Sequence, residues 1–237
     1  METKLLEPNR ENIETAAQII RRGGLVAFPT ETVYGLGADA FNAAAVAAVY
    51  EAKGRPSDNP LIVHIADSAE LTRLTPVVTD VMKRLADRFW PGPLTMVVKR
   101  VPALPNVTTG GLDTVGVRLP DSEATRALIA VSGCPLVGPS ANLSGKPSPT
   151  RAQHVVDDLA GRIDAVLMGD DCRVGIESTV LDLSTDTLTI LRPGIITPEQ
   201  IETAVGLPVQ FDPALTKTKI GAHIASPQTP DAAQDAT

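Results

Sequence analysis

Residues 12–37 read NIETAAQIIRRGGLVAFPTETVYGLG, and this stretch decides the fold class. Its first half has apolar side chains at helical spacing, at Ile13, Ala16, Ala17 and Ile20. Two glycines end that pattern, so residues 12–22 are predicted to form an amphipathic helix. Residues 25–28 are a short apolar run that predicts a buried strand, and a polar loop follows from Pro29. Helix, strand and loop in this order are typical of an α/β protein.

The same alternation continues to about residue 205. Further strands are predicted over residues 61–65, 94–99, 115–119, 136–137, 165–168, 179–183 and 187–191. Further helices are predicted over residues 42–53, 78–89, 122–131, 150–159 and 197–205. Thr197 and Gln200 form a capping box for the last helix, which should end at Gly206, and Asp186 is expected in a hairpin turn.

Length and composition favour one domain. A chain of 237 residues can bury one sizeable core. Apolar residues make up 43% of it but aromatic residues only 3%, so the core should be aliphatic, as in a parallel or mixed sheet covered by helices. Polar and small residues dominate the end of the chain. We therefore expect a domain over residues 1–207 and a flexible tail or linker stub over residues 208–237.

Charge and cysteine content exclude several classes of protein. The formal net charge of −7 argues against a protein that holds nucleic acid by bulk phosphate attraction. Cys134 and Cys172 lie far apart without metal-ligand spacing, which disfavours a disulfide framework or a zinc site, and no residue is assigned as a metal ligand. No secretory leader is recognisable, and no apolar run reaches the roughly 18 residues that span a bilayer. We expect a cytoplasmic protein.

Polar segments follow several predicted strands, where open α/β sheets place their ligand sites. In KGRPSDNP, residues 53–60, Arg55 can bind two oxygens of a phosphate or carboxylate at once, whereas Lys53 is a mobile point charge. In VGPSANLSGKPSPT, residues 137–150, Ser140, Asn142 and several exposed amides suit oxyanion or phosphate recognition. This segment matches neither a Walker P-loop nor a dinucleotide fingerprint. Together the two segments predict an anion-binding cavity.

Three arginines strengthen this prediction. Arg55, Arg118 and Arg192 each lie beside a predicted strand end, and together they would concentrate positive charge in an otherwise acidic protein. Each segment alone also fits a structural role: KGR can cap a helix, the serine-rich run can be a surface loop, and His64 can be a core side chain. Convergence in one pocket decides between these alternatives.

Seven segments taken in order resemble one known family. They are PTETVYGLG (29–37), KGRPSDNPLIVHI (53–65), FWPGPLTMVV (89–98), VGVRLPD (115–121), PSANLSGKPSPT (139–150), ESTVLDL (177–183) and ILRPG (190–194). In this order they are similar to the YrdC/TsaC family of threonylcarbamoyl-AMP synthases, over about residues 13–205. The resemblance implies a twisted mixed α/β sheet, flanked by helices, around a large basic concave cavity.

The resemblance also implies a reaction. L-threonine and bicarbonate (or CO2) would form a carbamate that attacks the α-phosphorus of ATP, giving threonylcarbamoyl-AMP and pyrophosphate, with Mg2+ on the phosphates. A separate transferase complex would then carry the threonylcarbamoyl group to the adenosine next to the anticodon of tRNA, so this chain would meet tRNA only indirectly. No membrane is involved.

Matching the family's motifs position by position assigns the site residues. The catalytic elements fall on Lys53, Arg55, Ser140 and Asn142. The L-threonine positions fall on Thr32, His64, Arg118, Gly138 and Ser178. The ATP positions fall on Arg55, Asn59, Thr114, Ser140, Ser148 and Arg192.

Two other functions are compatible with the same motifs. One is an RNA-binding module that uses the basic cavity, against which the net charge of −7 counts. The other is a carbamoyl-transfer domain of the hydrogenase-maturation type, which normally belongs to longer chains with zinc-finger and acylphosphatase parts. In longer relatives a linker closes over the nucleotide, and residues 208–237 are either a partial lid or a tail.

Overall fold

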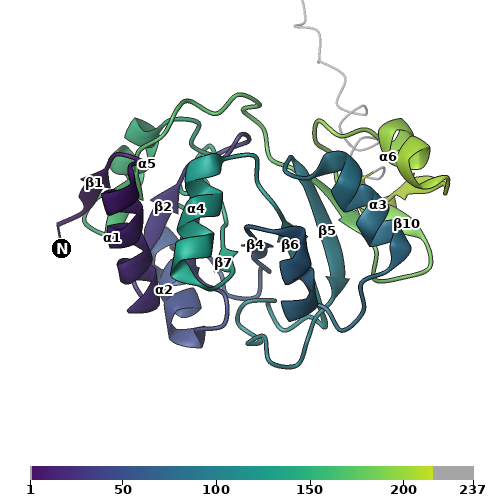
Figure 1. Cartoon of the computed structure of the whole chain (residues 1–237), viewed down its shortest axis with the longest axis horizontal. Coiled ribbons are helices and arrows are strands. Elements are labelled where there is room, and N and C mark those ends of the chain that lie inside the picture. The colour runs from purple at the N-terminus through teal and green to yellow at the C-terminus, as the bar shows by residue number, and fades with distance from the viewer. Residues whose placement is uncertain (1, 216–237) are drawn as a thin grey trace, which may run out of the picture.

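The predicted alternation forms one mixed sheet covered by helices (Figure 1). The protein is described here by a computed structural model that covers residues 2–215. The strands are β1 (Lys4–Leu6), β2 (Val26–Phe28), β3 (Gly35–Asp39), β4 (Ile62–His64), β5 (Leu94–Lys99), β6 (Thr114–Arg118), β7 (Leu136–Val137), β8 (Ala165–Leu167), β9 (Thr179–Asp182), β10 (Leu188–Arg192) and β11 (Val209–Phe211). Their order in the sheet is β1-β8-β2-β3-β7-β4-β6-β5-β9-β10-β11.

The pairing of the central strands brings distant segments together. β4 pairs with β6 in parallel, and His64 is the register partner of Arg118. β7 lies antiparallel between β3 and β4, so the loop that follows Val137 starts beside both of them. β5 continues the sheet to β9 in parallel. The polar segments that the sequence analysis singled out therefore meet near the middle of the sheet.

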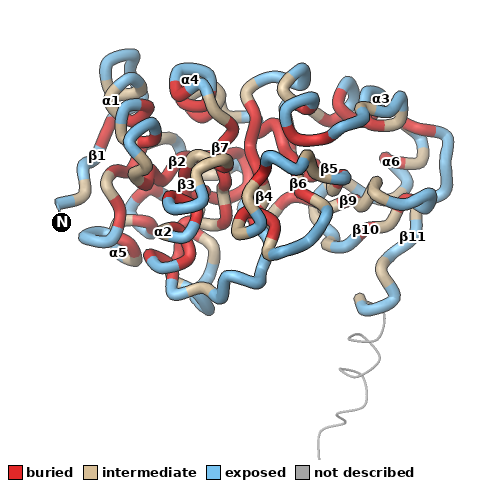
Figure 2. Tube along the Cα trace, turned by 90° about the horizontal axis from the view of Figure 1, so that it is seen from below, coloured by how far each residue is buried: buried red, intermediate tan, exposed pale blue. Residues whose placement is uncertain are grey.

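Helices cover both ends of the sheet. They are α1 (Arg10–Arg21), α2 (Ala43–Lys53), the 3-10 helix η1 (Ser68–Arg73), α3 (Asp80–Phe89), α4 (Glu123–Ser132), α5 (Ala152–Leu159) and α6 (Pro198–Val205). α1 packs against α4, and their apolar faces share a core cluster with β2 and β8. α3 packs against α6 at the β10 end, as Figure 1 shows. Buried residues run along the central strands of the sheet (Figure 2).

Caps fix the helix ends that matter for the site. The Asn42 side chain accepts hydrogen bonds from two backbone amides at the start of α2. Gly54 ends α2 in the left-handed conformation, at φ 61°, which costs glycine little. Lys53 is thus the last residue of a well-ended helix, and its side chain is buried rather than directed to solvent.

Most predicted elements are confirmed, with boundaries that shift by up to two residues. β5 and β7 have the predicted bounds. The capping box of α6 and its end at Gly206 are present, and β9 and β10 form the expected hairpin around Asp186. The sequence analysis did not predict β1, η1, β3 or β11.

β3 was missed because its glycines gave it the composition of a loop. Gly35 and Gly37 lie opposite Phe28 and Val26 on β2. A Cβ on Gly35 would lie 2.7 Å from the Phe28 ring, and one on Gly37 would lie 2.8 Å from it. The glycines are therefore required by the aromatic ring that crosses the strand, and PTETVYGLG is a loop followed by a strand.

The expected C-terminal tail begins with a strand. β11 pairs in parallel with β10, so the sheet continues past residue 207. The rest of the predicted tail, residues 216–237, lies outside the described residues. No helix in residues 2–215 has the length and apolarity of a bilayer-spanning segment. Cys134 and Cys172 are both free thiols.

Candidate functional site

A cavity of about 250 Å³ gathers most of the predicted site residues. Eight of them line it: Thr32, Arg55, His64, Arg118, Gly138, Ser140, Ser178 and Arg192. They come from the loop before β3, the end of α2, the ends of β4, β6 and β10, and the segments after β7 and before β9. We call this space the arginine cavity.

Two of its three arginines form no ion pair with a carboxylate among the described residues. Arg118 forms an ion pair with Glu31, whereas neither Arg55 nor Arg192 forms one within residues 2–215. Burial lowers the pKa of both guanidiniums; for Arg192 the nearby Glu177 carboxylate partly opposes this, and the positive charges of Arg118 and Arg55 lower the pKa further. An entering anion would relieve this repulsion, so the cavity is suited to phosphate or carboxylate.

Arg55 has hydrogen-bonding capacity to spare. Its Nη2 donates one long hydrogen bond of 3.4 Å to the carbonyl of Pro60. Its Nε is buried without a hydrogen-bond partner. A buried donor without a partner is costly unless a ligand satisfies it. Arg55 is therefore the side chain in this cavity that is best placed to receive an anion.

Arg192 is held by the EST segment. Its Nε donates to the carbonyl of Ser178 at 3.0 Å, and its Nη2 donates to the Ser178 hydroxyl at 3.1 Å. Ser178 also shares a hydrogen bond of 2.7 Å with the buried hydroxyl of Thr95 on β5. This chain of contacts fixes the guanidinium against β5 and β9. Thr95 was not predicted for the site, because its pattern is that of an ordinary strand residue.

His64 is buried and neutral. Burial and the nearby charge of Arg118 lower its pKa to about 3. Its ring packs edge-on against Phe28 at 5.5 Å, and its Nδ1 has no hydrogen-bond partner. A Cβ on Gly138 would lie only 2.5 Å from that Nδ1, which explains the glycine. At neutral pH His64 can therefore offer a hydrogen bond but no charge.

Lys53 and Asn142 do not line the arginine cavity. The Lys53 ammonium donates hydrogen bonds to the backbone carbonyls of Ser140 and Asn142, the latter at 2.6 Å. The Asn142 amide donates to the carbonyls of Leu143 and Lys146 at 2.8 Å each. Both side chains thus fix the serine-rich segment 137–150 by hydrogen bonds to its backbone carbonyls, without lining the cavity themselves. They set the position of Ser140, which does line the cavity.

Three predicted ATP residues also lie outside the arginine cavity. Asn59 is exposed, and its carbonyl accepts a hydrogen bond from Tyr50. Thr114 lies on the same face of β6 as Arg118 but at the other end of the strand. Ser148 lines a separate cavity of about 460 Å³ and donates a 2.5 Å hydrogen bond to Glu177. Ser148 is therefore linked to the arginine cavity through Glu177, which lines it.

Two carboxylates were not predicted for the site. Glu177 is the acidic residue among those that line the arginine cavity, and the hydrogen bond from Ser148 lowers its pKa. Glu31 lies within PTETVYGLG and pairs with Arg118 at 2.8 Å. Both residues lie in segments that were predicted to form the site, PTETVYGLG and ESTVLDL. The sequence alone, however, does not indicate which carboxylate lies next to which arginine.

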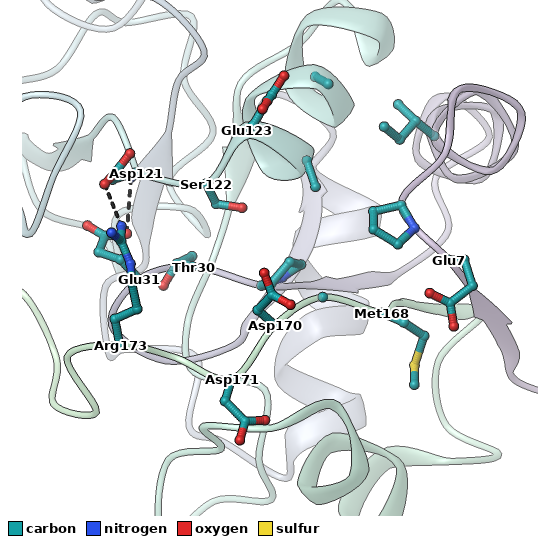
Figure 3. A pocket seen from close by; sticks show the side chains of 16 residues that line it. Glu7, Thr30, Glu31, Asp121, Ser122, Glu123, Met168, Asp170, Asp171 and Arg173 are labelled. Atoms are coloured by element: carbon teal, nitrogen blue, oxygen red, sulfur yellow. Dashed lines mark hydrogen bonds and ion pairs between the residues drawn. The ribbon is translucent and has the colours of Figure 1, made fainter.

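A larger cavity of about 880 Å³ adjoins the site and is acidic (Figure 3). Its acidic lining residues are Glu7, Glu31, Asp121, Glu123, Asp170 and Asp171. We call it the acidic cavity. Arg173 reaches over it to Asp121, at 2.6 Å. The large basic cavity expected from the resemblance remains a prediction; Arg55, Arg118 and Arg192 line the smaller of the two spaces.

Comparison with known proteins identifies relatives over most of the chain. Residues 18–194 match the family model Sua5_yciO_yrdC, described as "Telomere recombination". A Bacillus subtilis protein called threonylcarbamoyl-AMP synthase is 53% identical over 215 residues, which are 90% of this chain and 62% of that protein. A Pyrococcus abyssi protein of the same name is 51% identical over 203 residues, 86% of this chain and 59% of that one. The chain thus spans about 60% of the length of these curated relatives.

A solved structure supports the same relationship. The crystal structure of P. abyssi Sua5 complexed with L-threonine superposes with a TM-score of 0.86 at 47% identity. The match covers 91% of this chain and 64% of that one. At this identity and TM-score the two proteins share their fold.

Proposed function

The chain belongs to the Sua5/YciO/YrdC family, and we therefore propose that it makes threonylcarbamoyl-AMP from L-threonine, bicarbonate (or CO2) and ATP. The observation that carries this proposal is the arginine cavity, where two arginines that form no ion pair among the described residues lie beside hydroxyls and a neutral histidine. The carbamate, the triphosphate and the threonine carboxylate are all anionic groups that must meet in such a reaction. Fixed cations and hydrogen-bond donors are what they need, more than a nucleophile.

In the proposed reaction the threonine amine and bicarbonate form a carbamate with loss of water. A carbamate oxygen then attacks the α-phosphorus of ATP, and pyrophosphate leaves. Arg118 would bind the threonine carboxylate, and Thr32, Ser178, His64 and the backbone of Gly138 would surround the rest of the amino acid. Because His64 stays neutral, it would orient a polar group without drawing a second anion to that end of the cavity.

Arg55 and Arg192 would bind the phosphates from the other end of the cavity. Ser140 would offer its hydroxyl to the bicarbonate-derived group, and Lys53 and Asn142 would act by holding Ser140 in place. Asn59, Thr114 and Ser148 would contact ATP outside the cavity itself. All these roles are carried over from the family pattern onto the residues described above.

Mg2+ fits the site as a companion of the nucleotide. No group of three or more potential ligands gathers within residues 2–215. A single carboxylate, Glu177, lines the arginine cavity. Mg2+ is commonly bound by one or two carboxylates together with substrate phosphates and water, which matches a lone Glu177. When bound, the ion would offset charge on the leaving pyrophosphate.

The proposal is tested by the substrate dependence of pyrophosphate release. Release from ATP should require both L-threonine and bicarbonate, and chromatography should detect threonylcarbamoyl-AMP. Release that continues without threonine would contradict the proposal. Carbamoyl phosphate replacing both co-substrates would favour carbamoyl transfer, and micromolar RNA binding without threonine-dependent release would favour an RNA-binding module.

Replacing Arg118 by lysine tests the carboxylate role. Lysine keeps the positive charge but lacks the planar fork that contacts three groups at once. The KM for threonine should rise about tenfold or more, while the KM for ATP stays within about twofold. Steady-state kinetics with each substrate varied in turn measures both values. An unchanged threonine KM would remove Arg118 from this role.

The product would serve a partner. Threonylcarbamoyl-AMP is a reactive mixed anhydride, so a downstream transferase complex must take it up to modify tRNA next to the anticodon. In this arrangement the present chain meets tRNA only indirectly, and it works in the cytoplasm, where that tRNA is found.

A further inference from the structure

Glu31 and Arg118 form the one ion pair of residues 2–215 in which both side chains are buried. Arg118 Nη2 lies 2.8 Å from Glu31 Oε1, and the two side chains are 5% and 3% exposed. In each of the other ion pairs of the described chain, at least one side chain is 43% exposed or more. Two buried charges are costly to desolvate, and a well-packed apolar pair is often as stable. Stability alone therefore gives no reason for this pair.

The pair fixes the guanidinium of Arg118 from several sides. Its Nε donates to the carbonyl of Gly92 at 3.2 Å, and its Nη1 donates to the Thr32 hydroxyl at 2.9 Å. Glu31 faces the remaining nitrogen, Nη2, as its ion-pair partner. Glu31 is itself fixed, because its Oε2 accepts a 3.0 Å hydrogen bond from the backbone amide of Asp121. One carboxylate thus ties Arg118 to the backbone that follows β6.

Glu31 does not line the arginine cavity, in which the ligand would bind. Arg118 lines the arginine cavity, whereas Glu31 lines the acidic cavity. The ion pair is therefore part of the wall between these two spaces. Figure 3 shows the acidic side of this wall, where Glu31 lies beside Asp121. A ligand in the arginine cavity would meet Arg118, and Glu31 would act on that ligand only through Arg118.

We propose that Glu31 is a positioning residue that holds Arg118 in the orientation in which it binds the carboxylate of the amino-acid substrate. This inference rests on the proposed function, because it takes that substrate to be L-threonine. Glutamine at position 31 is isosteric, but it is uncharged, and its single oxygen cannot both face Arg118 and accept the hydrogen bond from the Asp121 amide. Aspartate keeps the charge but is one methylene too short to reach both.

The two possible roles of Glu31, offsetting the charge of Arg118 and positioning its side chain, predict opposite effects on threonine binding. If Glu31 only offsets the charge of Arg118, removing it makes the arginine cavity more positive, and an anionic carboxylate should bind more tightly. If Glu31 positions Arg118, removing it should weaken binding despite the added positive charge. Glu31→Asp separates the two roles further. If only the charge of Glu31 matters, this variant should bind threonine like the wild type; if Glu31 positions Arg118, it should bind threonine as weakly as Glu31→Gln.

Calorimetric titration with L-threonine, and separately with ATP, tests the inference. Glu31→Gln and Glu31→Asp should each raise the Kd for threonine about tenfold or more, with the Kd for ATP within about twofold of the wild type. Asp170→Asn is the matched control, since it makes the same charge change on the wall of the acidic cavity, and it should alter neither Kd. In steady state the two Glu31 variants should raise the threonine KM and keep kcat within about threefold.

An unchanged or lower threonine Kd in Glu31→Gln would overturn the inference. If that variant does not fold by circular dichroism, Glu31→Asp decides alone, and wild-type affinity there would overturn it equally. A wild-type protein that binds no threonine would instead contradict the proposed function, so the two failures are distinct.

Discussion

Replacing Arg55 by alanine should lower kcat/KM by at least about 30-fold, which corresponds to about 2 kcal/mol or more of lost transition-state stabilisation. Arg55 lines the arginine cavity, forms no ion pair within residues 2–215, and keeps a buried Nε without a partner. Its donors are thus available for the phosphates, where a charge-assisted contact strengthens as charge develops on the leaving group. Steady-state kinetics with ATP varied gives the value.

Two features make this result specific. Arg55 makes only one weak hydrogen bond to the protein, so its removal should leave the fold nearly as stable as before. Arg84→Ala is the matched control, because Arg84 is an exposed arginine on α3 that lines none of the cavities described above. Arg84→Ala should keep wild-type turnover. Wild-type turnover in Arg55→Ala would mean that the phosphates bind elsewhere.

The sequence was most informative where burial and capping act locally. Apolar runs predicted β5 and β7 to the residue, and the capping box at Thr197 predicted α6. β11 carried no such signal, because it is an exposed edge strand whose partner, β10, holds it by backbone hydrogen bonds. β3 was hidden for a different reason, since the ring of Phe28 requires glycine where a strand usually has larger residues.

The candidate site was predicted as a set of segments but not as a set of contacts. The ends of β4 and β6 had to meet once both strands joined one parallel pair, so His64 and Arg118 could be expected to be neighbours. The pairing of Arg118 with Glu31 depends on how the PTETVYGLG loop folds back, which no local pattern encodes. The same holds for Lys53, whose partners lie 87 and 89 residues further along the chain.

Lys53 keeps a charge that burial opposes. Burial, and then the nearby charge of Arg55, lowers its pKa from 10.5 to about 8. At about 1.4 kcal/mol for each pH unit, this lowering of the Lys53 pKa corresponds to about 3 to 4 kcal/mol. Both the folded and the unfolded chain are protonated at neutral pH, so the whole cost is present there. Because the buried ammonium lowers the stability of the fold, the presence of a lysine at this position is better explained by its hydrogen bonds to the serine-rich segment 137–150 than by a contribution to folding.

Replacing Lys53 by methionine should therefore lower activity strongly without lowering the free energy of unfolding. Methionine leaves the carbonyls of Ser140 and Asn142 without their donor, and the segment should shift. A displacement of about 1 Å near reacting groups can cost about 100-fold in rate, and a loss of that order in kcat/KM is expected. The free energy of unfolding at pH 7 should change little or rise, because the buried charge is gone.

The pH dependence of stability provides the check. Between pH 8 and about 10, the unfolded chain binds a proton at Lys53 that the folded chain has released, so the wild type should gain stability with rising pH. The difference in unfolding free energy between wild type and Lys53→Met should shift by up to about 3 kcal/mol across that window, toward the wild type.

Lys83→Met is the control, because Lys83 is exposed and its ion pair is with the exposed Asp80, and it should show no such shift. Urea titrations at several pH values measure each curve. Parallel curves for wild type and Lys53→Met would mean that the ammonium is not destabilised by burial, and the hold of Lys53 on Ser140 would then contribute to folding as well as to the site.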